Sequence, residues 1–157
     1  MTAWYVVLQA LGVVAFLVAV WKGGSVERRA ALILLGNNLV TVATDELGAS
    51  RPVAVVAWID GATAVLFLWL ALRHQRWWLL AATAALTLCT ATWTISLLNP
   101  SVSFYAAASA EIGEWAVVYL ALLAGAGERW LAGEPAAPFG KAGRMSGPAA
   151  DVTAEGR

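Results

Sequence analysis

Long runs of apolar residues, separated by short polar links, constrain this chain more than any other feature. Several runs reach about 18 residues, the length at which a helix can cross the hydrocarbon core of a membrane. Apolar residues make up 61% of the chain and charged residues 13%, whereas an ordinary soluble domain carries about 25% charged residues. A soluble protein of 157 residues could not bury so much apolar surface in one core. The sequence therefore predicts an all-α polytopic membrane protein.

Polar links divide residues 1–124 into five predicted transmembrane helices that form one domain. The predicted spans are residues 4–21, 30–47, 53–73, 77–98 and 104–124. The first span is read as a retained helix rather than a signal peptide, because residues 1–9 contain no lysine or arginine. Residues 125–157 are rich in Gly, Pro and Ala and predict a polar cytoplasmic tail, mostly disordered.

The basic residues orient these spans. With the N-terminus outside, nine of the ten lysines and arginines fall in links and tail on the inside, and only Arg51 falls outside. If the fifth helix did not cross, the split would be five to five. Because cytoplasmic segments carry an excess of Lys and Arg, the charges favour five spans with the N-terminus out and the C-terminus in. The bias toward Arg, Ala and Gly fits a high-GC bacterial genome. Together with the predicted spans, it predicts a bacterial inner membrane.

Two further patterns predict how the helices pack. The spacings Ala15-xxx-Ala19 and Ser109-xxx-Gly113 place small residues one helical turn apart, which permits close helix approach. Four tryptophans fall well inside the predicted spans and are expected to pack between helices: Trp58, Trp69, Trp93 and Trp115.

Acidic residues gather at one depth of the predicted bilayer. The orientation places five carboxyls in its outer half: Asp45, Glu46, Asp60, Glu111 and Glu114. Ionisable groups at membrane depth are costly and usually face the bundle interior or water. Carboxylate and amide oxygens suit protons or hard cations, so the candidate proton or cation site comprises Asp60, Glu111, Glu114, Asp45 and Asn38.

A structural role competes with this interpretation. Asp45 and Glu46 could lie among the outer headgroups, and for Asp60, Glu111 and Glu114 the two interpretations are evenly matched. Hydroxyl-bearing residues also form polar stripes, and one such stripe follows a single face of the fourth helix: Thr83, Thr87, Thr90 and Thr94. We expect these threonines to form hydrogen bonds between helices.

Neither catalytic nor cofactor-binding motifs are present in the sequence. It has no Walker loop, dinucleotide fingerprint, HExxH motif or nucleophile elbow. The single cysteine and the single histidine exclude cysteine-rich metal sites and two-histidine haem ligation within one chain. The net charge is zero, which does not suggest nucleic acid as a partner. We therefore expect no enzyme activity and no catalytic, cofactor or metal site.

Several short motifs within residues 4–125 carry a family resemblance. They are Trp21-Lys22-Gly23-Gly24, Glu27-Arg28, Asp60, Ala71-Leu72-Arg73, Arg76-Trp77-Trp78 and Leu98-Asn99-Pro100. In these motifs the chain resembles a group of small, uncharacterised polytopic inner-membrane proteins of proteobacteria. The resemblance implies a membrane fold and no activity. The Asn37-Asn38 pair and the Glu111/Glu114 pair are not features of that group.

These observations leave two functions open. The first is a non-catalytic accessory or interaction subunit of the membrane, which the small size and the lack of catalytic motifs favour. The alternative is a proton- or cation-handling transporter or channel subunit that uses the acidic cluster. Expected partners are the lipid bilayer and a second copy or a larger membrane complex, because five helices are few for a transporter that acts alone.

Overall fold

Five α-helices joined by short links make up the described part of the protein. The computed structural model describes residues 3–46, 53–99 and 101–133. The helices are α1 (Ala3–Lys22), α2 (Ser25–Glu46), α3 (Val53–His74), α4 (Trp77–Leu98) and α5 (Phe104–Leu131). Every regular element in this part of the chain is helical, so the all-α prediction is confirmed.

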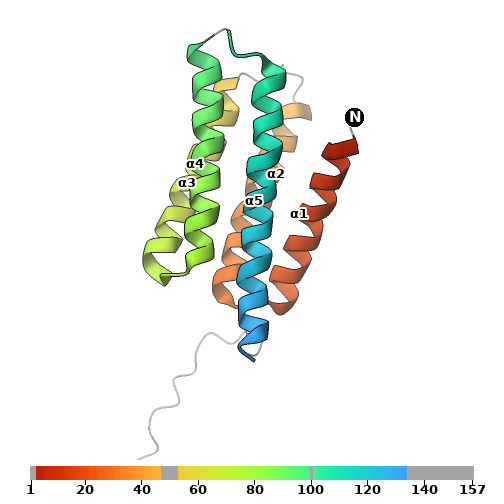
Figure 1. Ribbon diagram of the computed structural model, residues 1–157, viewed down its shortest axis with the longest axis vertical. Helices are drawn as coiled ribbons and strands as arrows, with labels where there is room; N and C mark the ends of the chain where they lie inside the picture. Colours follow the sequence, from red (N-terminus) through yellow and green to blue (C-terminus); the bar gives the residue numbers. More distant parts are fainter. Residues whose placement is uncertain (1–2, 47–52, 100, 134–157) are drawn as a thin grey trace, which may run out of the picture.

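The helices stand side by side and alternate in direction (Figure 1). Each helix packs against the next along the chain, α1 returns to pack along α5, and α2 also touches α5. The links after α1 and α3 lie at one end of the bundle, and the link between α4 and α5 lies at the other. We call the end with the α4–α5 link the outer end and the opposite end the inner end, after the orientation that the charges predict.

Three helices have the length and apolar character needed to cross a membrane. They are the segments Ala54–His74, Trp77–Leu98 and Phe104–Leu131. Large apolar side chains are exposed on their outward surfaces, among them Trp58, Leu88 and Leu120. Soluble proteins rarely expose extensive apolar patches, whereas acyl chains accept them readily. The bundle is therefore suited to an apolar surrounding.

Two helices are longer than the sequence predicted. α2 begins at Ser25 rather than residue 30, and α5 continues to Leu131 rather than ending at residue 124. The predicted tail thus begins with nearly two helical turns, which tertiary contacts described below hold against the inner end. Residues 134–157, for which disorder was predicted, lie outside the described residues.

Small residues allow close helix approach at some of the predicted positions. Ala15 and Ala19 are completely buried, as their spacing predicted. Ser109 and Gly113 are exposed instead, so the prediction of a packing face there is wrong. A stronger contact was not predicted: the indole of Trp78 lies so close to Gly125 that a Cβ there would sit 2.5 Å from the ring.

The deep tryptophans divide into two pairs. Trp93 and Trp115 are buried, as predicted. Trp58 and Trp69 are exposed on α3, so the prediction that they pack between helices is wrong for this pair. Their separation of 11 residues is close to three helical turns and places both on the outward face of α3, opposite the buried Ala57 and Asp60.

We expect Gly125→Ala to weaken the contact between α4 and α5. The added methyl group would overlap the rigid, fully buried indole of Trp78, and overpacking of this kind costs about 1–3 kcal/mol. Thermal unfolding in detergent, followed by circular dichroism, should show a lower midpoint. Gly127→Ala is the matched control, because no atom lies within 4 Å of a Cβ at Gly127 and alanine favours helix. Equal midpoints for the two variants would contradict the packing role of Gly125.

Candidate functional site

A buried polar cluster joins α2 to α3 in the outer half of the bundle. The amide Nδ2 of Asn37 donates to Oδ1 of Asp60 at 3.2 Å and to Oγ1 of Thr63 at 2.9 Å. Thr63 in turn donates to the carbonyl of Ile59 at 2.9 Å, within its own helix. Asn37, Asp60 and Thr63 are all more than nine-tenths buried. The Asp60 carboxyl thus points into the bundle, and an amide donor from a neighbouring helix positions it.

A polar cavity of about 200 Å³ lies beside this cluster. Its walls come from α1, α2, α3 and α5, and they carry both Asp60 and Glu111. Five neutral polar residues also line it, and the other five lining residues are apolar or aromatic. The neutral polar residues are Gln9, Asn37, Asn38, Thr41 and Tyr119. The structure therefore brings together two of the predicted acidic residues, Asp60 and Glu111, which are 51 positions apart in the sequence.

These groups lie at nearly the same depth. At 1.5 Å of rise per residue, Asp60 and Glu111 are each about 10 Å from the start of their helices, and Asn37 is about 14 Å from the end of α2. Each distance is counted from the outer end, because α3 and α5 begin there and α2 ends there. Asp60 and Glu111 are therefore equally far from the outer ends of their helices, which agrees with the prediction of a shared depth for these two residues.

Glu114 belongs to a different environment from the other two acidic residues. Its Oε1 accepts a hydrogen bond of 2.9 Å from Thr92 on α4, and it does not line the polar cavity. The two residues are only about 60° apart around the axis of α5, yet Glu111 lines the cavity whereas Glu114 contacts α4. Glu114 therefore joins α4 to α5 near the cavity without opening into it.

The remaining predicted groups have different outcomes. Asn38 lines the polar cavity, and its amide donates to the carbonyl of Leu34 in its own helix at 3.0 Å. The side chains of Asp45 and Glu46 lie outside the described residues. Within the described residues, no three His, Cys, Asp or Glu side chains come together as a metal site.

The threonine stripe of α4 does not link helices by donating hydrogen bonds. Each of the four hydroxyls donates to the carbonyl four residues earlier in α4 itself, at 2.7–3.0 Å. This local bond is the usual way for a threonine to satisfy its hydroxyl within a helix. The predicted hydrogen bonds between helices are wrong for this stripe, and none of these threonines lines the polar cavity.

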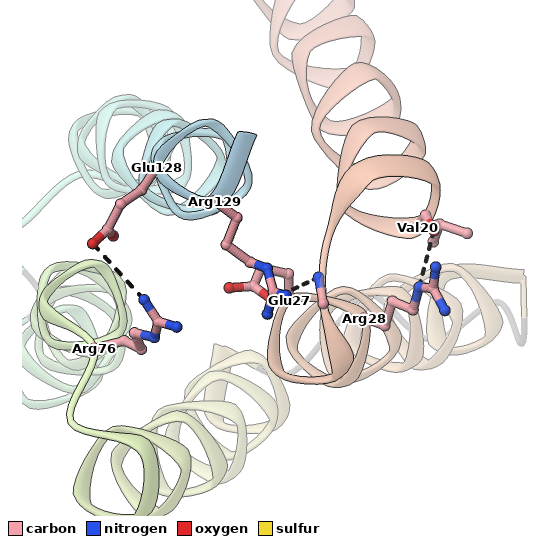
Figure 2. A network of polar contacts seen from close by, with 7 residues as sticks. Val20, Glu27, Arg28, Arg76, Glu128 and Arg129 are labelled. Atoms are coloured by element: carbon pink, nitrogen blue, oxygen red, sulfur yellow. Dashed lines mark hydrogen bonds and ion pairs between the residues drawn. The ribbon is translucent and has the colours of Figure 1, made fainter. Parts of the chain in front are cut away.

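The inner end contains a buried carboxyl that the sequence analysis did not select. Glu27 is 1% exposed, and its Oε2 accepts a hydrogen bond of 2.9 Å from the backbone N–H of Gly24 (Figure 2). The same oxygen lies 3.9 Å from an Arg129 guanidinium nitrogen, at the far end of the chain's last described helix. A Cβ at Gly24 would overlap that guanidinium group, so only glycine leaves room for it. Glu27 therefore caps α2 and clamps it to α5.

A second ionic contact holds the α3–α4 link to α5. A guanidinium nitrogen of Arg76 lies 3.8 Å from Oε1 of Glu128, and the indole N–H of Trp77 donates to Oε2 of Glu128 at 3.1 Å. Figure 2 shows both contacts of α5 side by side, with Glu128 directed to one neighbour and Arg129 to the other. Nearby, Nε of Arg28 donates to the carbonyl of Val20 at 3.0 Å, which satisfies the end of α1.

One sequence signal could have located this inner cluster. A glutamate three residues after the residue that precedes a helix is half of a capping box, and Gly24 and Glu27 have that spacing. Counting Glu27 as a cap would have placed the start of α2 at Ser25. No local signal indicates that Arg129 is the partner, since 102 positions separate the two residues.

No known protein family, curated protein or solved structure was found to match the chain.

Replacement of Asn37 by leucine should destabilise the bundle more than the same change at Asn38. Asn37→Leu removes the donor to Asp60 and Thr63, and a buried polar group left without its partner costs about 1–3 kcal/mol. Asn38→Leu removes only a bond to its own helix. Thermal unfolding in detergent should give the lower midpoint for Asn37→Leu. A larger effect at Asn38 would mean that the Asn37–Asp60 contact does not hold α2 to α3.

Arg129→Gln should destabilise the protein by about 3 kcal/mol, toward the lower end for a buried ion pair that loses one member. The reason is that Glu27 would keep its buried charge without the facing cation. Unfolding midpoints can be compared with those of Arg29→Gln, a neutralisation at an exposed position close to Glu27. A midpoint for Arg129→Gln equal to that of the control would show that the clamp contributes nothing.

Proposed function

We propose that this chain is a five-span protein of a bacterial inner membrane that takes up a proton or a small cation in its outer cavity. The observation that carries the proposal is that Asp60 and Glu111, from two different helices, line one polar cavity about 10 Å below the outer end. The N-terminus outside and the C-terminus inside is the orientation that the distribution of basic residues favours.

The length and composition of α1 and α2 support two further spans, which with the three apolar helices make five. α1 has 20 residues and is about 30 Å long, which matches the hydrocarbon thickness. In α2 the charged residues lie within the first five and the last two positions, so the 15 residues between them, 30–44, carry no ionisable charge. Both helices expose large apolar side chains, such as Val13 and Leu39, along the outside of the bundle.

The chemistry of the cavity supports a cationic guest. Two carboxyls face one space, and the other lining residues of that space are apolar or neutral polar ones. In apolar surroundings two ionised carboxylates close together are costly, and a proton or a cation offsets that cost. The hydrogen bond that the Asn37 amide donates keeps Asp60 oriented toward the interior, whether the cavity is empty or occupied.

The inner half of the bundle limits what one copy can do. It is filled by large, fully buried side chains, including Phe67, Leu70 and Trp78. A single copy thus offers a binding site that is reached from outside rather than an open pore. We propose that passage across the membrane requires rearrangement of the helices or association with a second copy, both of which can occur in the purified protein.

The role as a non-catalytic accessory or interaction subunit stays a prediction. It differs from the cation-handling role in one measurable respect, because an accessory subunit would be recovered in a stable larger complex and would move no ions alone. The absence of enzyme activity likewise stays a prediction that rests on the sequence motifs.

Purified protein in liposomes with an internal pH-sensitive dye tests the cation-handling proposal. Under an imposed gradient the wild type should carry protons or Na⁺, and Asp60→Asn and Glu111→Gln should each reduce the flux at least tenfold. Glu114→Gln is the matched control, because that carboxyl lies outside the cavity and the amide oxygen can still accept from Thr92. Absence of flux in the wild type would overturn the proposal. Flux that survives in both cavity variants would do so as well.

A further inference from the structure

A second, apolar cavity adjoins the polar one. It measures about 300 Å³ and lies between α1, α2 and α5. Its walls are apolar side chains and Gly12, together with three polar residues. The same three residues also line the polar cavity: Gln9, Asn38 and Tyr119. The two cavities are therefore neighbours, with these three side chains between them. Their combined volume falls in the range of small-molecule sites, about 300–1,000 Å³.

The apolar cavity faces the side of the bundle. Val13 and Leu17 of α1 and Val42 of α2 line it, and each of these side chains is more than half exposed. In the proposed membrane setting, such a mouth opens to acyl chains rather than to water. A guest with an apolar body could enter between α1 and α2 without crossing the headgroup layer.

The junction of the two cavities is aromatic. The rings of Trp115 and Tyr119 lie with centroids 5.6 Å apart, and both residues line the polar cavity beside Glu111. Tyr119 is held against Gly12, where a Cβ would sit 2.8 Å from its ring. Aromatic rings and carboxylates together are the groups that recognise organic ammonium cations. Inorganic cations, by contrast, would not fill the apolar cavity between α1, α2 and α5.

We propose that the two adjacent cavities together bind an amphiphilic organic cation, which passes between them at the shared side chains. Its ammonium group lies among Asp60, Glu111 and the Trp115–Tyr119 pair, and its apolar body lies in the α1–α2–α5 cavity, which it reaches from the membrane. This inference rests on the proposed cation-handling function, and it gives the same carboxyls an organic guest that competes with the proton or small cation. The negative charge of the polar cavity selects the head, and the apolar lining of its neighbour selects the tail.

Three probes test the two halves of the site separately: octyltrimethylammonium, tetramethylammonium and octanol. Calorimetric titration of the full chain in nanodiscs, with empty nanodiscs subtracted, should show saturable binding of octyltrimethylammonium. Tetramethylammonium lacks the tail and octanol lacks the charge, so each should bind at least tenfold more weakly. Equal binding of octanol and octyltrimethylammonium would overturn the proposal, because simple apolar partition would then explain the result.

Matched variants locate the binding. Glu111→Gln and Val13→Trp should each weaken octyltrimethylammonium binding at least tenfold, the first by removing a charge and the second by filling the apolar cavity. Glu114→Gln and Val14→Trp should leave it unchanged, because neither residue lines either cavity and Val14 is as accessible as its neighbour. Circular dichroism confirms that each variant remains folded. Unaltered affinity in both cavity variants would overturn the proposal.

The liposome assay separates this inference from the function on which it rests. If the wild type carries protons or Na⁺ but does not bind octyltrimethylammonium, the amphiphile inference is wrong and the cation-handling function stands. If it neither carries ions nor binds the probe, both are wrong. If it binds the probe at the mapped site and carries no ions, the binding inference stands and the transport function is wrong.

Discussion

The buried carboxyl of Glu27 holds α2 to α5 at the inner end of the bundle. α1 and α2 are joined by only Gly23 and Gly24, so these two helices form a hairpin that must be attached to the other three. Glu27 attaches it by accepting from Gly24 within the turn and facing Arg129 of α5 across the interface. A carboxylate in such a buried place is tolerated only because both a donor and a cation reach it. Together with the Asn37–Asp60 bond between α2 and α3, this contact holds the hairpin that supplies two walls of the outer cavity.

The two ends of the bundle use polar groups differently. At the inner end, each of two acidic side chains faces an arginine, Glu27 with Arg129 and Glu128 with Arg76. At the outer end, two carboxyls face a cavity whose other lining residues are apolar or neutral polar ones. Matched charges are typical of structural contacts, whereas a carboxyl pair lining a cavity is typical of sites that receive a proton or a cation. The inner end therefore holds the helices together, and the outer end contains the polar cavity.

Several short motifs of the sequence lie at the inner end. Gly24 and Glu27 form the cap of α2, and Arg76 and Trp77 contact Glu128. Trp78 fills the space over Gly125. The physical role of these motifs is to join helices. The groups proposed to bind a cation lie elsewhere, in the outer half of the bundle.

Local chemistry explains what could be predicted about the helices and where prediction failed. Apolar length and the Asn99-Pro100 stop placed α4 at residues 77–98, as observed. The prediction ended α5 at residue 124 because Gly125 and Gly127 disfavour helix locally. The structure continues it because Trp78, Glu27 and Arg76 lie where the next turns can contact them. Contacts between residues far apart in the chain outweigh local propensity in this case.

The sequence by itself determined that the chain is a bundle of apolar helices with acidic residues at one depth, because length, hydropathy and helical rise are local properties. Only the tertiary structure decided which acidic residues share a cavity. Glu111 and Glu114 are three positions apart, yet the rotation between them directs one to α1, α2 and α3 and the other to Thr92 of α4. Spacing along one helix reveals its faces, but the neighbour of each face is known only when the helices have packed.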